Sequence, residues 1–384
     1  MRTRQSYRQP VDSLKQPPVT PPSSYQGVLE LTPKGFGFVR AKSLTLAPSP
    51  NDTYVPAHLV TRYRLRTGAE VTGNTTHGKG KSPEAISIDQ VSGLPVDTWA
   101  RLQEFSQLQV ISPHEMIRLE CARCDRSMRV VALFCPIGRG QRALIVSPPK
   151  AGKTMLLQQL AHAISQNNPD VELEVLLVDE RPEEVTDMRR TVRGDVYASS
   201  SDLDRASHVR LAQLVLEQAK RKVEAGRHIV LLLDSLTRLG RAFNAHQKSS
   251  GRTMSGGVDI RALEIPKRIF GAARTIEQGG SLTIIATALI DTGSRMDQLI
   301  FEEFKGTGNM ELVLDRELAN ERIFPAIDLK LSGTRREELL FGDSVGNHQQ
   351  LRRSVARLSA RDAMLAVQKL LEQYPTNDTL LSKM

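Results

Sequence analysis

The segment with the clearest chemistry covers residues 147–154, which read Ser-Pro-Pro-Lys-Ala-Gly-Lys-Thr. It follows an apolar run and opens an amphipathic helical stretch, which is the context of a phosphate-binding P-loop. In such a loop, backbone N–H groups converge on phosphate oxygens. Lys153 would neutralise the β- and γ-phosphates, and the Thr154 hydroxyl would ligate Mg²⁺. Because Ser147 replaces the first glycine of the usual pattern, a helix start that binds no nucleotide is the alternative.

Two carboxylates stand at the ends of apolar runs, where they would accompany this loop. Asp234 closes the run 229–233 and could hold Mg²⁺, directly or through water. Glu180 follows the run 175–178, at the carboxyl edge of the sheet, where ligands bind in open α/β folds. A carboxylate placed there can orient and deprotonate an attacking water. Together with a P-loop, the two carboxylates predict nucleotide hydrolysis.

The elements that must position these residues form an alternating pattern from residue 126 to residue 384. Four β-like runs that are almost entirely apolar, at 143–146, 175–178, 229–233 and 282–286, are separated by amphipathic helical stretches. Strands that are apolar throughout and separated by helices indicate a parallel sheet buried on both faces. We therefore predict an α/β domain over 126–384, preceded by a connector over 93–125.

The N-terminal part has a different pattern. Residues 1–24 contain five prolines and are predicted to form a disordered basic arm. Residues 25–92 contain five short β-like runs separated by Gly, Pro, Asn and Asp, and they predict a small all-β barrel of the OB type. These runs are 27–31, 35–40, 53–55, 69–71 and 85–88.

The chain has 384 residues and a net charge of +9, and residues 1–92 carry six of these excess positive charges. A basic N-terminal module indicates a polyanionic partner, with nucleic acid ahead of membrane because no basic amphipathic helix accompanies it. Solvated surface charge is the alternative. No apolar run is long enough for a membrane helix, and the N-terminus has no signal-peptide core. The three cysteines are predicted to be reduced thiols, which fits a cytoplasmic protein.

The motor motifs occur in an order that resembles the bacterial Rho family of transcription termination factors. The resemblance extends over residues 25–384. The matching segments are 148–154, 179–185, 232–238, 271–274, 286–294, 303–311 and 332–338.

The resemblance implies a role for each matched residue. It implies that ATP with Mg²⁺ is held by Asp234 and by the loop residues Pro149, Lys150, Ala151, Gly152, Lys153, Thr154 and Met155. Asp234 would be the Walker B carboxylate and Glu180 the general base, with Lys150 and Arg181 as further catalytic residues. Arg335 resembles the family's arginine finger, which a neighbouring subunit of a hexameric ring supplies.

RNA contacts are implied at three places. The segment that contains Arg252 resembles the Q-loop of the family, and Lys305, Gly306 and Thr307 resemble its R-loop. In the barrel, Phe36, Phe38, Arg40 and Tyr54 resemble the primary RNA site. Phe36 and Phe38 lie two residues apart, so they would project from one face of a strand and stack on adjacent bases. Packing of both rings inside the barrel is the alternative.

The primary site departs from the family pattern in one segment. Residues 80–84 read Gly-Lys-Ser-Pro-Glu and do not provide both the Glu and the Tyr that complete its base pocket, which leaves the base preference open.

The function implied by the resemblance is an RNA-dependent ATPase that moves 5′→3′ along RNA as a homohexamer and terminates transcription. Single-stranded RNA would be its main partner, with RNA polymerase and elongation factors as further partners, and no membrane. The alternatives are a divergent paralogue of the family, another RecA-like ring ATPase without a termination role, and an RNA-binding protein that has lost its motor. The intact set Lys153, Thr154, Glu180, Asp234 and Arg335 opposes the last of these.

Overall fold

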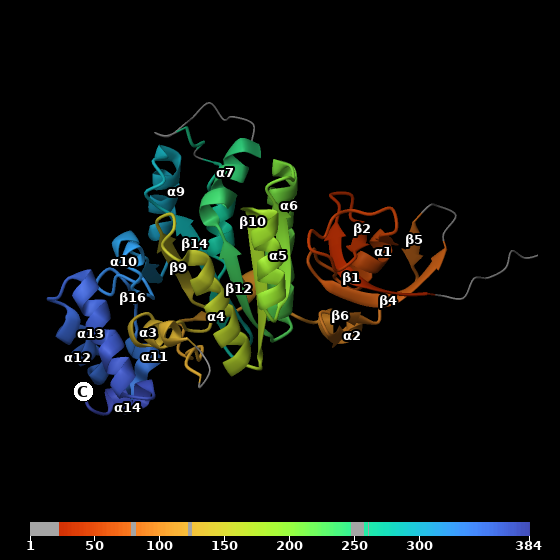
Figure 1. Cartoon of the computed structure of the whole chain (residues 1–384). Helices are drawn as coiled ribbons and strands as arrows, with labels where there is room; N and C mark the ends of the chain where they lie inside the picture. Colours follow the sequence, from red (N-terminus) through yellow and green to blue (C-terminus); the bar gives the residue numbers. More distant parts are fainter. Residues whose placement is uncertain (1–22, 78–81, 122–124, 247–256, 260) are drawn as a thin grey trace, which may run out of the picture.

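A computed structural model describes residues 23–77, 82–121, 125–246, 257–259 and 261–384. The predicted Q-loop residue Arg252 lies outside these ranges. A small β-barrel lies beside helix α6 of a larger α/β domain, and the C-terminal helices lie at the opposite end of that domain (Figure 1).

The barrel confirms the predicted OB-type fold. Its strands follow the order β1-β2-β3-β5-β4, and pairing of β1 with β4 closes it. Leu29, Val39, Val55 and Val71 fill its core. The elements are β1 (Ser23–Leu31), β2 (Gly37–Arg40), β3 (Thr53–Val55), α1 (Ala57–Arg62), β4 (Glu70–His77) and β5 (Pro83–Ala85), followed by the short pair β6 (Gln90–Val91) and β7 (Leu94–Pro95) and by α2 (Val96–Trp99).

The larger domain confirms the predicted α/β fold. Its sheet has the order β11-β10-β12-β14-β9-β15-β16, and all of these strands except β16 are parallel to their neighbours. The strands are β8 (Val110–Ile111), β9 (Arg142–Ser147), β10 (Val171–Glu180), β11 (Asp195–Ser200), β12 (His228–Asp234), β13 (Arg274–Ile276), β14 (Ser281–Leu289), β15 (Met310–Val313) and β16 (Gly333–Thr334).

Helices cover both faces of this sheet, which explains why its central strands are largely apolar. Side chains alternate between faces along a strand, so Leu176 and Leu177 belong to different cores. One core contains α3 (Arg126–Phe134), α4 (Lys153–Asn167), α5 (Pro182–Thr191), α12 (Val345–Val355) and α13 (Ala360–Gln373). The other contains α6 (Arg205–Glu224), α7 (Leu236–His246), α8 (Glu264–Phe270) and α9 (Arg295–Lys305).

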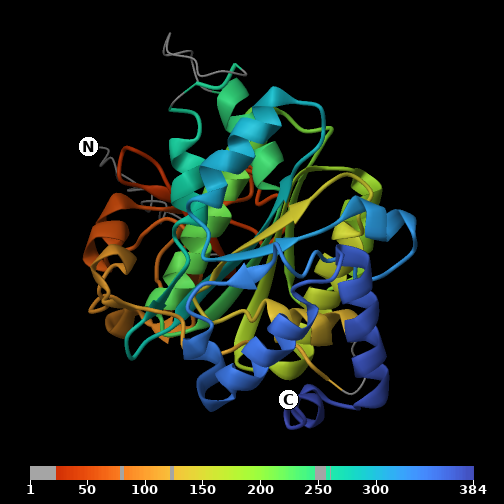
Figure 2. The same cartoon turned by 90° about the vertical axis from the view of Figure 1, so that its left-hand side faces the viewer.

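The C-terminal helices extend the first core. α12 and α13 pack with α3 and with α14 (Asn377–Leu381), and the chain ends among these helices (Figure 2). Two short helices, α10 (Arg316–Asn320) and α11 (Glu338–Phe341), flank β16 in the sequence.

The barrel and the motor share part of their packing. Leu46, from the loop after β2, is fully buried in the motor core together with Val28 of β1. The backbone N–H of Ala198 in β11 donates to the carbonyl of Leu44 at 2.8 Å. The predicted connector is itself packed, because β8 pairs with β13 and Phe105 is buried in the motor core.

Among the described residues, no helix is long and apolar enough to cross a membrane. Cys121 is disulfide-bonded, so the prediction of three reduced thiols is wrong at that residue. Cys135 is free and buried, and burial raises the pKa of its thiol to about 12.

Candidate functional site

The P-loop connects β9 to the first turn of α4, as the motif predicts. Gly152 is the residue before α4 and has φ +92°, a left-handed conformation that glycine adopts without strain. Lys150 is also left-handed, at φ +66°, and its side chain is exposed. The 15-residue helix α4 begins at Lys153, directly after Gly152. Its free N–H groups and its dipole favour an anion at this end.

Lys153 and the two predicted carboxylates meet at the carboxyl edge of the sheet. The Lys153 Nζ lies 2.5 and 2.6 Å from the two oxygens of Asp234 and 3.8 Å from Oε2 of Glu180. Thr287 of β14 donates its hydroxyl to Asp234 Oδ1 at 2.7 Å. These residues come from the ends of β10, β12 and β14 and the start of α4, so their meeting requires the parallel sheet.

A distortion at the end of β10 positions Glu180. The pairing of β10 with β11 shifts register between Val178 and Glu180, and the intervening Asp179 has φ +55°. Such bulges re-aim a side chain, often beside active sites. Glu180 is only 2% exposed. Burial, and then the charge of Asp234, raise its pKa.

One oxygen of Glu180 is available to a ligand. Its Oε1 forms an ion pair with Nη2 of Arg238 at 2.9 Å, whereas Oε2 has no hydrogen-bond partner among the described residues. A buried acceptor without a partner is costly. An acceptor in this position fits the proton of a water molecule, as a general base requires.

Arg238 is a residue whose role the sequence reasoning missed. It lies on α7 and also donates to the backbone carbonyl of Asp179, so it holds both the bulge and the carboxylate. Arg238 belongs to the matched segment 232–238, so the sequence marked it as a residue of interest. Only the fold shows which groups it contacts.

The donor set fits a magnesium ion. The Thr154 hydroxyl lies in the first turn of α4, directly after Lys153, and Lys153 contacts Asp234. A hydroxyl and a carboxylate are oxygen ligands of the kind that Mg²⁺ prefers, with water and substrate phosphates completing the shell.

An apolar cavity of about 220 Å³ lies beside the P-loop, lined by the predicted nucleotide-binding residue Met155 and by Phe324, which the sequence reasoning missed. Phe324 and Met155 are 48% and 62% exposed. A Cβ placed on Gly152 would lie 3.5 Å from the Phe324 ring. An exposed aromatic ring next to a phosphate loop can stack on the base of a nucleotide. No local motif marks Phe324, because the loop after α10 brings it to the site.

The two further predicted catalytic residues lie at the same edge of the sheet. Lys150 belongs to the loop itself, and Arg181 is the exposed N-cap residue of α5, directly after Glu180.

Arg335 lies at the opposite edge of the sheet, where the parallel strand β9 begins. Its backbone N–H donates to the carbonyl of Asn309 at 2.9 Å, and the Asn309 side chain accepts from the N–H of Arg142, where β9 begins. The P-loop follows the other end of β9, five residue steps away, or roughly 17 Å at 3.3 Å per step. The fold therefore does not bring Arg335 to the Lys153 of its own chain.

The predicted R-loop residues share this second edge. The carbonyl of Thr307 accepts a hydrogen bond from Nε of Arg142 at 3.0 Å. Lys305 and Gly306 are exposed at the end of α9, and the Lys305 Nζ lies 5.6 Å from the centre of the Phe301 ring.

The barrel presents three aromatic rings together. The rings of Phe36, Phe38 and Tyr54 have centroids 5.4 to 5.9 Å apart, and Phe38 and Tyr54 are paired across β2 and β3. All three are partly exposed and lie outside the barrel core. Packing inside the barrel is thereby excluded. The prediction of one strand over 35–40 is wrong at its start, because β2 begins at Gly37 and Phe36 lies in the preceding turn.

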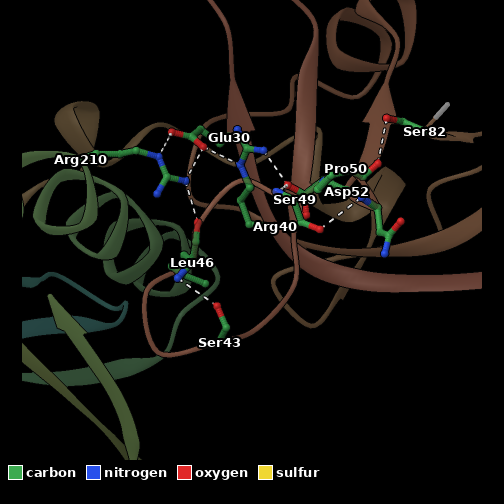
Figure 3. A network of polar contacts seen from close by, with 10 residues as sticks. Glu30, Arg40, Ser43, Leu46, Ser49, Pro50, Asp52, Ser82 and Arg210 are labelled. Carbon is green, nitrogen blue, oxygen red and sulfur yellow. Dashed lines mark hydrogen bonds and ion pairs between the residues drawn. The ribbon is translucent and has the colours of Figure 1, made fainter. Parts of the chain in front are cut away.

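Arg40 takes part in an ion-pair network, so its guanidinium is not free in solvent (Figure 3). Its guanidinium lies 5.3 Å from the centre of the Phe38 ring. It also donates to Glu30 at 2.6 Å and to Asp52 at 2.7 Å, which leaves its side chain 11% exposed. Arg40 thus borders the aromatic cluster, but its charge is already paired.

Two family models match the chain. The RNA-binding domain of Rho termination factors matches residues 25–97, and the nucleotide-binding domain of the ATP synthase alpha/beta family matches residues 127–334. The two models therefore cover the barrel and the motor, respectively.

Curated relatives match over nearly the whole chain. The transcription termination factor Rho of Cereibacter sphaeroides is 48% identical over 93% of this chain and 86% of its own length. The Rho of Haemophilus influenzae is 48% identical over 93% and 87%. Ehrlichia chaffeensis has two matching proteins, Rho 1 and Rho 2, each 49% identical over 88% of this chain and 82% of its own length.

Solved structures show the same motor fold at low identity. A prototypical ATPase from a type III secretion system of pathogenic bacteria aligns with a TM-score of 0.57 at 21% identity, covering 74% of this chain and 76% of the other. The ATP synthase subunit NeqB of Nanoarcheaum equitans aligns with a TM-score of 0.56 at 17% identity, covering 71% and 72%. The match to a RecA-like ATPase fold confirms the predicted motor architecture.

Proposed function

The chain belongs to the family of Rho transcription termination factors, and from this premise we propose that it is a ring-forming motor that moves 5′→3′ along RNA by hydrolysing ATP. At the coarser level it is an ATP-hydrolysing, RNA-binding termination factor. Membership of this family favours a Rho factor over another RecA-like ring ATPase as the identity of the chain. The hexamer, the direction of movement and a contact with RNA polymerase are part of the proposal.

The observation that carries the proposed hydrolysis is the convergence of Lys153, Asp234 and Glu180 at one sheet edge. The Lys153 ammonium forms an ion pair with Asp234, and a bound nucleotide would offer it phosphate oxygens as further partners. Glu180, held by Arg238, would accept the proton of the attacking water at Oε2. Mg²⁺ held by Thr154 and Asp234 would neutralise charge on the phosphates.

Arg335 supports the proposal that the active unit is a ring. It lies at the sheet edge opposite the P-loop, so it can act as an arginine finger only in the site of a neighbouring copy. A planar guanidinium suits the charge that spreads over the γ-phosphoryl group in the transition state.

Mixing experiments test this arrangement. Arg335→Ala should lower ATP turnover by about 10³-fold, and adding this variant to wild-type protein should inhibit the wild-type sites as well. Arg336→Ala is the matched control, because Arg336 is the exposed neighbour, with a 3.7 Å ion pair to Glu338. Activities that simply add in the mixture would contradict a finger supplied by another subunit.

RNA would be captured by the aromatic cluster of the barrel and would also contact the Lys305 loop of the motor. Stacking of bases on aromatic rings tolerates any base sequence, since every base has a π-face. The Arg252 segment is proposed as a further contact on the basis of the family motif alone.

A panel of homopolymer RNAs and single-stranded DNAs tests the function as a whole. ATP turnover should rise with RNA and rise less with DNA, because 2′-hydroxyl contacts distinguish the two. ATP turnover that does not change when RNA is added would favour a divergent paralogue without a termination role. Release of transcripts from a stalled elongation complex would separate a terminator from such a paralogue.

A further inference from the structure

A chain of four charged side chains connects the RNA-binding face of the barrel to the motor (Figure 3). Arg210 on α6 of the motor donates to Glu30 of β1 through Nε at 2.9 Å and through Nη2 at 2.7 Å. Oε2 of Glu30 also accepts from Arg40 at 2.6 Å, and Arg40 donates to Asp52 at 2.7 Å. One carboxylate is therefore shared between a guanidinium of the barrel and a guanidinium of the motor.

This chain of contacts is well held at both ends. The Arg210 guanidinium also donates to the carbonyl of Leu46 at 2.7 Å, and Leu46 is buried in the motor core. Asp52 is 4% exposed and accepts from the backbone N–H of Ser49 at 2.7 Å. Burial acts to raise the pKa of Glu30, but the hydrogen bonds from Arg210 and Arg40 outweigh it and lower that pKa. Glu30 thus stays charged between its two partners.

The Arg40 guanidinium borders the aromatic cluster of the barrel. Arg40 is placed 5.3 Å from the Phe38 ring centre, beside the surface on which bases would stack. Two carboxylates compete with an RNA phosphate for this cation. Because Arg210 takes up part of the hydrogen-bonding capacity of Glu30, Glu30 cannot turn both oxygens toward Arg40.

We propose that Arg210 of the motor is a positioning residue for the RNA site of the barrel: by sharing Glu30 it limits the hold of this carboxylate on the Arg40 guanidinium beside Phe38, so that an RNA phosphate can compete for Arg40. This inference rests on the proposed RNA-binding function. It implies that the RNA affinity of the barrel depends on how α6 is docked against it. Arg210 itself need not touch RNA.

A double-mutant cycle in the full chain tests the proposal. The measurement is fluorescence anisotropy with labelled hexaribonucleotides of cytidine and of uridine, without nucleotide. Arg210→Gln should weaken binding by about 3- to 10-fold, the effect of losing one net hydrogen bond. Glu30→Gln removes one competitor for Arg40 and should strengthen binding. Arg210→Gln added to Glu30→Gln should then have no further effect, because the contact runs through Glu30.

Two further variants separate positioning from general charge and from domain packing. Arg210→Lys can keep one hydrogen bond to Glu30 and should recover most of the affinity. Lys42→Gln removes the same charge from another ion pair between barrel and motor, that of Lys42 with Asp195 at 2.7 Å. This pair does not include Glu30 or Arg40, so Lys42→Gln should change the affinity by less than about twofold.

The outcomes are distinct. An equal loss on Arg210→Gln with and without Glu30→Gln would show that Arg210 acts on RNA directly, and the proposal would be overturned. Equal losses in Lys42→Gln and Arg210→Gln would attribute the effect to domain packing and would also overturn it. Basal ATP turnover should be unchanged in all of these variants. A wild-type chain that binds neither oligonucleotide would instead refute the proposed function.

Discussion

The catalytic edge of the motor, where Lys153, Glu180 and Asp234 meet, differs in its physical requirements from the aromatic cluster of the barrel. At the catalytic edge the carboxylates of Glu180 and Asp234 are each only 2% exposed and lie around one lysine. On the barrel, three rings are partly exposed, and the adjacent cation is already paired. The first site concentrates charge away from water, whereas the second offers flat apolar surface to it.

This difference follows from what each site has to do. Charges that stabilise a transition state act more strongly in a desolvated, preorganised site. Stacking on bases needs accessible rings and modest charge, so that RNA can be bound and released. The motor site is accordingly assembled from four elements that are distant in sequence, and the barrel site from two neighbouring strands and the turn before one of them.

The largest effect should come from Lys153→Ala. Loss of the ammonium that contacts both Asp234 and Glu180 should lower ATP turnover by about 10³-fold or more, because the γ-phosphate charge is no longer stabilised. RNA binding by the barrel, measured by anisotropy, should remain. A parallel loss of RNA affinity would show that the two sites are not separable in this way.

Glu180→Gln also tests the catalytic edge of the motor. Loss of the general base should reduce turnover by about 10²- to 10⁴-fold. Since burial and Asp234 raise the pKa of Glu180, wild-type turnover should fall on acidification at a higher pH than an ordinary glutamate would give. The direction follows because a base works only when it is deprotonated. A pH–rate profile checks this, and an acid limb that persists unchanged in the Gln variant would assign it to another group.

Phe38→Ala tests the barrel side. Removing one stacking ring should weaken RNA binding by about 5- to 150-fold, from 1–3 kcal/mol per base. ATP turnover without RNA should be unaffected. Tyr63→Ala is the matched control, because Tyr63 is a partly buried barrel aromatic outside the cluster. Equal effects of the two variants would point to a destabilised barrel instead of lost stacking.

The smallest expected effect is that of Phe324→Ala at the cavity beside the P-loop. Loss of base stacking should raise the KM for ATP by about 2- to 12-fold, from 0.5–1.5 kcal/mol for an aromatic pair. The value of kcat should hardly change, because such binding is equal in the ground and transition states. A fall in kcat with unchanged KM would mean that Phe324 positions the phosphates.

The core of the catalytic edge could be predicted from sequence for a physical reason. Carboxyl ends of parallel strands share one edge, so Lys153, Glu180 and Asp234 had to meet once the strands were recognised. The two domain folds followed from strand length and apolar pattern in the same way.

Residues whose role depends on tertiary packing were not predictable. Arg40 was expected to face RNA, yet its charge is shared with Glu30 on a neighbouring strand and Asp52 in the loop before β3. Arg238 and Phe324 reach the catalytic edge from α7 and from the loop after α10, and neither has a spacing that signals it. Their roles depend on rotamers and loop paths, which no local pattern encodes.

The burial of Leu46, Val28 and Phe105 in the motor core has a thermodynamic consequence. Side chains that precede the motor in sequence complete its hydrophobic interior, so melting the barrel would leave a hole in the motor. The two domains should therefore lose structure in one cooperative calorimetric transition, although sequence and family models divide them. In this sense the modules are separable in function but form a single unit of stability.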